Sequence, residues 1–114
     1  MSSNGYVTAD KLFSQPAKRR FTEVEVGEHK FRLQSWTSKE AQRFVSQNAK
    51  NPRTVNERLI VMVCVDGEGN PVFGSDDIER LQNMDAAFVA QLAKCCLEHV
   101  GLDSIEDDED AEKN

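Results

Sequence analysis

The chain has 114 residues, of which 39% are hydrophobic and 30% charged, so it has room for one domain with one modest hydrophobic core. Its longest apolar run, residues 59–65, is far shorter than the roughly 18 residues that a membrane-spanning helix needs. The first ten residues lack the basic start and the apolar stretch of a secretory signal. The composition therefore predicts a small cytoplasmic protein with no membrane partner.

Charge is distributed unevenly along the sequence. Residues 1–58 carry 11 Lys and Arg against 6 Asp and Glu, a net charge of +5, whereas residues 59–114 carry 3 against 14, a net charge of −11. The basic cluster at residues 18–20 is too short for the concentrated basic surface that nucleic acids require, so we expect no nucleic-acid partner. The asymmetry fits two separately solvated faces, or copies that stack head to tail with opposite charges in contact.

The N-terminal segment begins with polar residues 1–7, which we expect to be flexible. Thr8 is a candidate N-cap for a short helix, and we expect Leu12 and Phe13 to pack onto the body of the protein. Pro16 ends this helix.

Residues 21–35 predict a β-hairpin with a two-residue turn at Gly27-Glu28, because glycine suits the first central position of a type II′ turn. This register sorts apolar side chains onto one face and opposite charges onto the other, as cross-strand pairing favours. The expected pairs are Val26 with His29, Val24 with Phe31 and Thr22 with Leu33 on the first face, and Glu25 with Lys30 and Glu23 with Arg32 on the second.

Two capping boxes follow the hairpin. Thr37 and Glu40 form the first, which predicts a helix that ends at residues 51–52. Its expected apolar stripe consists of Ala41, Phe44, Val45 and Ala49. Residues 54–57 form the second box and precede the apolar run 59–65, which is compatible with a buried strand or a buried helix. The box favours the helix.

The C-terminal half begins with a turn at residues 66–71. Ser75 is a candidate N-cap of a short helix with Ile78 and Leu81 facing inward, and Asp85 is a candidate N-cap of a final helix that ends at Gly101. Residues 103–114 contain seven acidic residues and predict a disordered tail. The expected fold class is therefore α+β, mainly α: an N-terminal β-hairpin, then a small bundle of three to four helices in a single domain spanning 1–102, and a disordered acidic C-terminal tail, 103–114.

No motif indicates a metal site. Asp66, Glu68 and Asn70 alternate as calcium ligands do, but an EF-hand would need glycine and glutamate where Pro71 and Asp77 stand. A solvated turn explains these residues. The three cysteines, Cys64, Cys95 and Cys96, lack the second pair of a zinc site and are expected to be small buried hydrophobes.

Catalytic and cofactor residues are equally hard to nominate. His29 and His99 are expected at peripheral positions, with no nucleophile and orienting group beside them. No glycine pattern matches a phosphate or dinucleotide loop. We therefore predict a protein that is not an enzyme, with no catalytic, cofactor-binding or metal-binding residues and no cofactor. The residues that contact a partner are not identified by the sequence.

The order of these elements is informative as a set. The chain begins with a short helix (residues 8–13), a V-x-V-G-x-x-x-F-R-L hairpin (24–33) and a capped helix (from 37). It continues with an apolar segment ending V-D-G-E-G-N-P-V-F (65–73), an acidic helix and a closing apolar helix. Over roughly residues 8–102 this resembles the tail assembly chaperones of long-tailed, lambdoid bacteriophages.

The resemblance implies a small, mainly helical protein that assists tail assembly in the host cytoplasm and is absent from the mature virion. It implies binding to the tape measure protein and recruitment of tail tube subunits. It also implies self-association, with a head-to-tail spiral as one form. It also implies a longer product made by ribosomal frameshifting, of which this chain is the short form.

Alternative functions stay open at this point. The chain could be a minor structural protein of the phage tail, such as a connector or completion protein, or a cytoplasmic protein-binding adaptor; an enzyme is the remotest option. Met62 and Met84 could line an exposed apolar surface for a helical partner or could simply fill gaps in the core.

Overall fold

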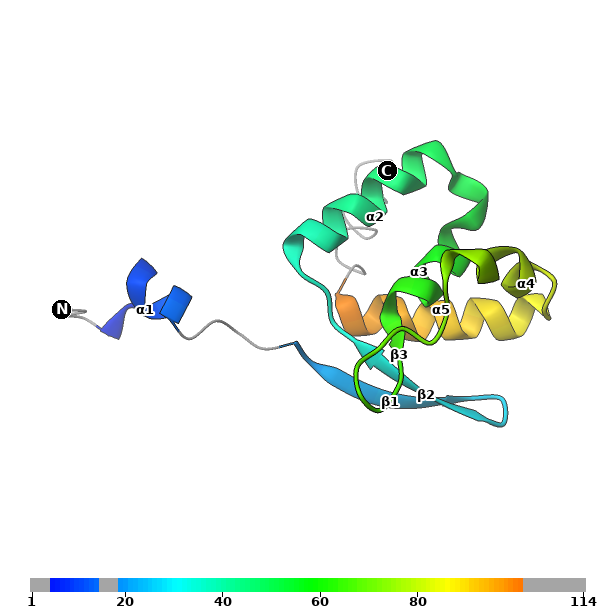
Figure 1. Cartoon of the computed structure of the whole chain (residues 1–114), viewed down its shortest axis with the longest axis horizontal. Helices are drawn as coiled ribbons and strands as arrows, with labels where there is room; N and C mark the ends of the chain where they lie inside the picture. Colours follow the sequence, from blue (N-terminus) through cyan, green and yellow to red (C-terminus); the bar gives the residue numbers. More distant parts are fainter. Residues whose placement is uncertain (1–4, 15–18, 102–114) are drawn as a thin grey trace, which may run out of the picture.

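In the computed structural model, which describes residues 5–14 and 19–101, a small antiparallel sheet packs beside a group of helices (Figure 1). The strand order in the sheet is β1-β2-β3. The elements in chain order are α1 (Ala9–Ser14), β1 (Phe21–Val26), β2 (His29–Gln34), α2 (Ser38–Lys50), the 3₁₀ turn η2 (Pro52–Thr54), α3 (Val55–Val63), β3 (Cys64–Val65), the 3₁₀ turn η3 (Ser75–Asp77), α4 (Ile78–Gln82) and α5 (Ala86–Val100). The mainly helical α+β fold with an N-terminal hairpin is confirmed.

The hairpin has the predicted register throughout, from Phe21↔Gln34 to Val26↔His29. Gly27 occupies the turn with a φ of 65°, a conformation that glycine adopts without a steric penalty. The predicted charge couples are confirmed as register partners, with Glu25 opposite Lys30 and Glu23 opposite Arg32. The ion pair that forms is the diagonal one, 3.9 Å between Lys30 and Glu23, while the Arg32 guanidinium reaches the loop after β3. Both Lys30 and Glu23 are well exposed, so this ion pair contributes little to stability.

The apolar run 59–65 contains both structures that the sequence allowed. It is helical up to Val63 and then becomes strand β3 without an intervening loop. Cys64 is the junction: its backbone N–H donates to Ile60 O as the last helical hydrogen bond, and Cys64 pairs with Leu33 of β2. The third strand was not predicted.

Helix α2 begins at the predicted capping box, with the Thr37 hydroxyl accepting from the Glu40 N–H at 3.1 Å and the Glu40 carboxylate accepting from the Thr37 N–H at 2.8 Å. The predicted apolar stripe is mostly wrong. Phe44 is the buried residue of α2, where its ring packs against Trp36 with 5.2 Å between centroids, and Val45 is 49% exposed. Ala49 is also exposed and Ala41 is half-buried, so the face of α2 that contacts the body is narrower than the predicted stripe.

The second predicted capping box is also wrong. Thr54 caps nothing with its side chain, because its hydroxyl accepts a hydrogen bond from Arg58 and donates to Asn51 O. The buried Arg58 guanidinium also donates to Asn51 O at 2.8 Å and to the side-chain oxygen of Asn48. Arg58 thereby ties the end of α2 to the start of α3.

The last two helices begin at acidic residues. Ser75 is not the N-cap that we predicted: it opens the turn η3, and the Asp77 carboxylate accepts from the Gly74 N–H at 2.9 Å instead. Asp85 is the N-cap of α5, as predicted, accepting from the Phe88 N–H at 3.0 Å. Gly101 ends α5 in the left-handed conformation, with a φ of 85°.

The core lies between the sheet, α3 and α5; in Figure 1 the hairpin lies below α5 and α2 lies above it. All three cysteines are free thiols, and Cys64 and Cys96 are buried as expected, whereas Cys95 is half-buried. A hydrogen bond with Cys64 and burial together raise the pKa of the Cys96 thiol. The fully buried side chains are Phe44, Leu33, Leu59, Ile60, Leu92, Val26, Val63, Cys64 and Cys96.

The N-terminal arm differs from expectation. Thr8 does cap α1, accepting from the Lys11 N–H at 3.2 Å. However, α1 has no buried residue, Phe13 is 75% exposed and Leu12 is also exposed, so these side chains do not pack onto the body. Figure 1 shows α1 apart from the remaining elements. The predictions for residues 1–4 and for the acidic tail 103–114 lie outside the described residues.

No helix among residues 5–14 and 19–101 has the length and apolar composition needed to cross a membrane.

Candidate protein-binding groove

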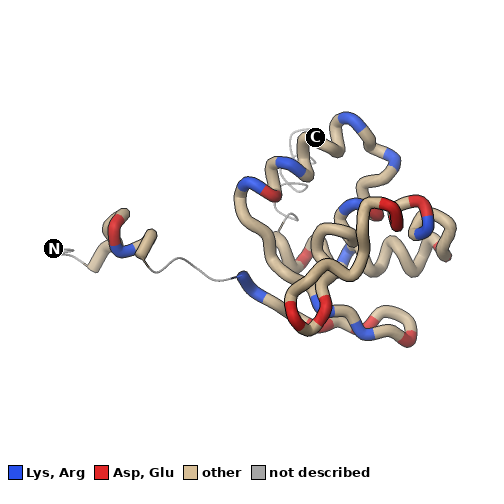
Figure 2. Tube along the Cα trace, in the orientation of Figure 1, with Lys and Arg blue, Asp and Glu red and all other residues tan. Residues whose placement is uncertain are grey.

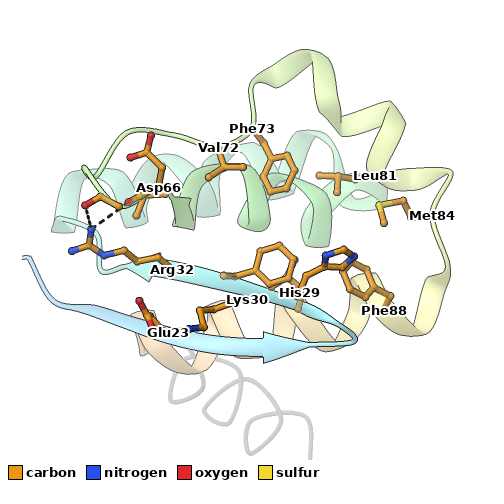
Figure 3. A pocket seen from close by; sticks show the side chains of 14 residues that line it. Glu23, His29, Lys30, Arg32, Asp66, Val72, Phe73, Leu81, Met84 and Phe88 are labelled. Carbon is orange, nitrogen blue, oxygen red and sulfur yellow. Dashed lines mark hydrogen bonds and ion pairs between the residues drawn. The ribbon is translucent and has the colours of Figure 1, made fainter.

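An apolar groove with a volume of about 500 Å³ opens between the hairpin, the segment that follows β3, and helices α4 and α5 (Figure 3). This volume is in the range typical of ligand-binding pockets. Its lining is mostly apolar and comes from several elements far apart in the sequence, which makes it the candidate functional site.

One wall of the groove is a cluster of three rings. His29 and Phe31 share a face of β2 because they are two residues apart on a strand. Phe88, in the first turn of α5, meets both: ring centroids are 6.2 Å apart for His29 and Phe88 and 6.1 Å apart for Phe31 and Phe88. The rings meet edge-on or tilted, as aromatic pairs prefer. Asp85 fixes this wall because it caps the turn that carries Phe88.

The facing wall comes from the segment after β3 and from α4. The Val72 N–H donates to Cys64 O at 3.2 Å, which holds the segment against β3. Val72 is 50% exposed and Met84 is 47% exposed, and Figure 3 shows these side chains, with Phe73 and Leu81, opposite the ring cluster. The groove thus offers apolar side chains that lose contact with water only if a partner covers them.

Polar groups mark one end of the groove. Arg32 donates to Gly67 O at 2.6 Å and to Asp66 O at 3.3 Å, and its guanidinium lies 4.1 Å from the centre of the Phe21 ring. The Asp66 carboxylate accepts from the backbone N–H groups of Glu68 and Asn70, and these hydrogen bonds lower the pKa of Asp66. An apolar centre with a polar rim is the usual anatomy of a protein-binding surface.

Of the methionines and histidines that the sequence analysis considered, one of each lies in the groove and the other lies elsewhere. Met84 lies in the groove, while Met62 is half-buried and packs against the core. His29 belongs to the ring cluster, whereas His99 sits at the other end of α5, where its ring Nε2 lies 3.2 Å from Arg20 O and the Arg20 guanidinium donates to His99 O at 3.0 Å.

Apart from Met84, none of the apolar groove residues was nominated from the sequence as a site residue; Phe31, Val72, Phe73 and Phe88 are examples. The hairpin register did place Phe31 on an apolar face, but only the folded chain shows that this face is partly left open. In the described part of the chain, no group of three His, Cys, Asp or Glu residues is arranged to hold a metal ion. The Asp66 carboxylate holds its own turn together instead.

Comparison with known proteins gives one informative likeness. The structure of the bacteriophage HK97 tail assembly chaperone superposes with a TM-score of 0.56 at 20% sequence identity, covering 80% of this chain and 92% of that one. The chain has the fold of a phage tail assembly chaperone. This agrees with the family resemblance noted in the order of sequence elements. No family model matches the sequence, and no curated protein matches it.

Because the match covers most of both chains, the likeness concerns the fold at large rather than an isolated hairpin or helix pair. At 20% identity the likeness concerns the backbone arrangement.

Proposed function

We propose that this chain is a phage tail assembly chaperone that binds the tape measure protein through the apolar groove, helps recruit tail tube subunits, and is absent from the mature virion. The observation that carries the proposal is the shared fold with the HK97 tail assembly chaperone over 80% of the chain. A chaperone of this kind would act in the host cytoplasm.

The groove suits an amphipathic helix as its occupant. Helix-in-groove recognition uses side chains spaced at i, i+3, i+4 and i+7 that insert into an apolar channel. Met84 and the ring of Phe88 provide an adaptable surface and a rigid surface side by side, so different apolar side chains could be accepted. The exposed Leu12 and Phe13 of the N-terminal arm add a second apolar surface that could extend the contact.

Self-association belongs to the same proposal. Figure 2 shows Lys and Arg concentrated along α2, with acidic residues near the turn after β3 and around α4. Copies that met through unlike patches would form a heterologous contact, which propagates into a ring or a spiral. Such association should weaken as salt is raised, because salt screens exposed charges. Association that did not respond to salt would contradict this part of the proposal.

Co-expression with the tape measure protein encoded nearby tests the chaperone function. We expect the two proteins to co-purify and the tape measure protein to remain soluble. If the tape measure protein stays insoluble and unbound, the chaperone function is wrong. The chain should then be sought in purified virions, where a connector or completion protein would be present and a chaperone absent.

A matched pair of variants tests whether the groove is the binding site. Val72 in the groove and Val45 on α2 are 50% and 49% exposed, so glutamate at either position should be tolerated by the fold. We expect Val72→Glu to lose the tape measure protein and Val45→Glu to retain it. Equal binding by the two variants would place the contact outside the groove while leaving the chaperone function intact.

A further inference from the structure

Helix α2 carries a ridge of positive charge. Lys39, Arg43 and Lys50, with Ser46 between them, follow the spacing i, i+4, i+7 and i+11, which places all four on one face of a helix. Arg53 follows in η2, and all five residues are exposed. The ridge lies on the side of α2 opposite Phe44, and it is visible in Figure 2 as blue segments along this helix. We call Lys39, Arg43, Lys50 and Arg53 the α2 ridge.

No cation of the α2 ridge forms an ion pair within the described part of the chain. The ion pairs there are Arg19–Glu40, Lys30–Glu23 and Arg80–Asp77, none of which involves a ridge cation. Glu40 is in α2 but is turned toward Arg19, at 3.0 Å. Neighbouring cations at i and i+4 repel each other, so the ridge is an unneutralised surface that favours an acidic ligand.

The chain itself contains a matching acidic segment. Residues 103–114 hold seven Asp and Glu against one Lys. Helix α5, which precedes this segment, ends close to the start of α2, because two consecutive residues bridge them: Arg19 binds Glu40 in the first turn of α2, and Arg20 binds His99 in the last turn of α5. Thirteen residues follow Gly101 and can span up to about 44 Å. The ridge from Lys39 to Lys50 is only about 17 Å long.

We propose that the acidic segment 103–112 binds intramolecularly along the α2 ridge. A short tether gives the segment a millimolar effective concentration at the ridge, so several weak charge pairs suffice to hold it there. Binding would neutralise the ridge and brace α2, whose buried residue is Phe44 alone. This inference does not depend on the function proposed for the groove.

Nuclear magnetic resonance of the ¹⁵N-labelled full chain tests the proposal. Raising NaCl from 50 to 500 mM should shift the amide signals of α2 together with those of residues 103–112. The same α2 shifts should appear at low salt when the segment is neutralised by the substitutions Glu106→Gln, Asp107→Asn, Asp108→Asn, Glu109→Gln and Asp110→Asn. Each charge interaction removed should lower the ratio of bound to free segment by about two- to five-fold.

Charge reversals identify the surface. Arg43→Glu should release the segment, whereas Lys94→Glu, at an exposed position of α5, should not. Adding Asp108→Lys to Arg43→Glu should restore binding. Shifts that are independent of protein concentration support an intramolecular contact. The proposal is overturned if neutralising the segment leaves the α2 signals unchanged, or if Arg43→Glu and Lys94→Glu have the same effect. It is also overturned if the shifts grow with protein concentration while the protein diffuses more slowly, because the contact is then between copies.

Discussion

Phe44 is the position at which a single substitution should separate one helix from the rest of the protein. It is 2% exposed and is the buried residue of the 13-residue helix α2. A phenylalanine side chain buries about 200 Å², worth about 5 kcal/mol at 25 cal/mol per Å², and measured Phe→Ala costs are about 3–5 kcal/mol. A helix of this length is marginal by itself in water. We therefore expect Phe44→Ala to unfold α2 locally rather than the whole domain.

Hydrogen exchange resolved by residue measures this effect. In Phe44→Ala, amides of α2 should exchange about 100-fold faster or more, which is what about 3 kcal/mol implies, while amides in the centres of α3 and α5 stay protected. Trp36, which packs against Phe44, is the only tryptophan in the sequence, so its emission should shift to longer wavelength. Val45→Ala is the control, because Val45 is adjacent and half-exposed. Concerted loss of protection across α2, α3 and α5 would refute the reasoning.

Three further predictions concern caps, pH and thiols. Asp85→Ala should cost about 1 kcal/mol in urea denaturation by removing the N-cap of α5, whereas Asp76→Ala, which removes no side-chain cap, should cost much less. Burial alone would raise the pKa of Glu40, but hydrogen bonds from Arg19 and from the backbone outweigh burial and hold this pKa below its usual 4.5. The ionised carboxylate therefore stabilises the fold above about pH 4.5. The difference in unfolding free energy between wild type and Glu40→Gln should vanish as pH falls through the lowered pKa of Glu40. A constant difference from pH 6 to pH 3 would contradict this. In the native protein the half-buried Cys95 thiol should react slowly with Ellman's reagent, because burial raises its pKa. The buried thiols of Cys64 and Cys96 should react only on unfolding. Three equal rates would contradict the structure.

Local signals in the sequence predicted the elements whose determinants are local. The hairpin register follows from alternating side chains and a glycine turn, and the α5 boundaries follow from Asp85 and Gly101. The box at residues 54–57 has the same form as that at 37–40, yet it fails because Arg58 captures the Thr54 hydroxyl. A motif four residues long does not reveal a competing donor in the next turn.

Long-range determinants account for what the sequence did not reveal. Whether Cys64 continues the helix or enters a strand depends on Leu33, which pairs with it across the sheet from 31 positions earlier in the chain. The groove combines side chains from β2, the segment after β3, α4 and α5, so its composition follows only from the tertiary arrangement. Exposed Val45 and Phe13 show the converse: apolar spacing indicated burial, but no element among residues 5–14 and 19–101 covers these side chains.

The direct passage from α3 into β3 has a mechanical consequence for the groove. A loop at this point would let helix and sheet slide relative to each other. Cys64 instead takes part in the helical hydrogen bonds of α3 and in the pairing of β3 with β2. One continuous backbone segment therefore joins the layer of α3 and α5 to the end of the groove at Val65. Inserting one residue there would rotate α3 by about 100° and turn Leu59 away from the core. The ring-cluster wall, which is built on β2 and α5, is therefore held in place relative to α3 before any partner arrives, and a preorganised wall loses little conformational entropy on binding.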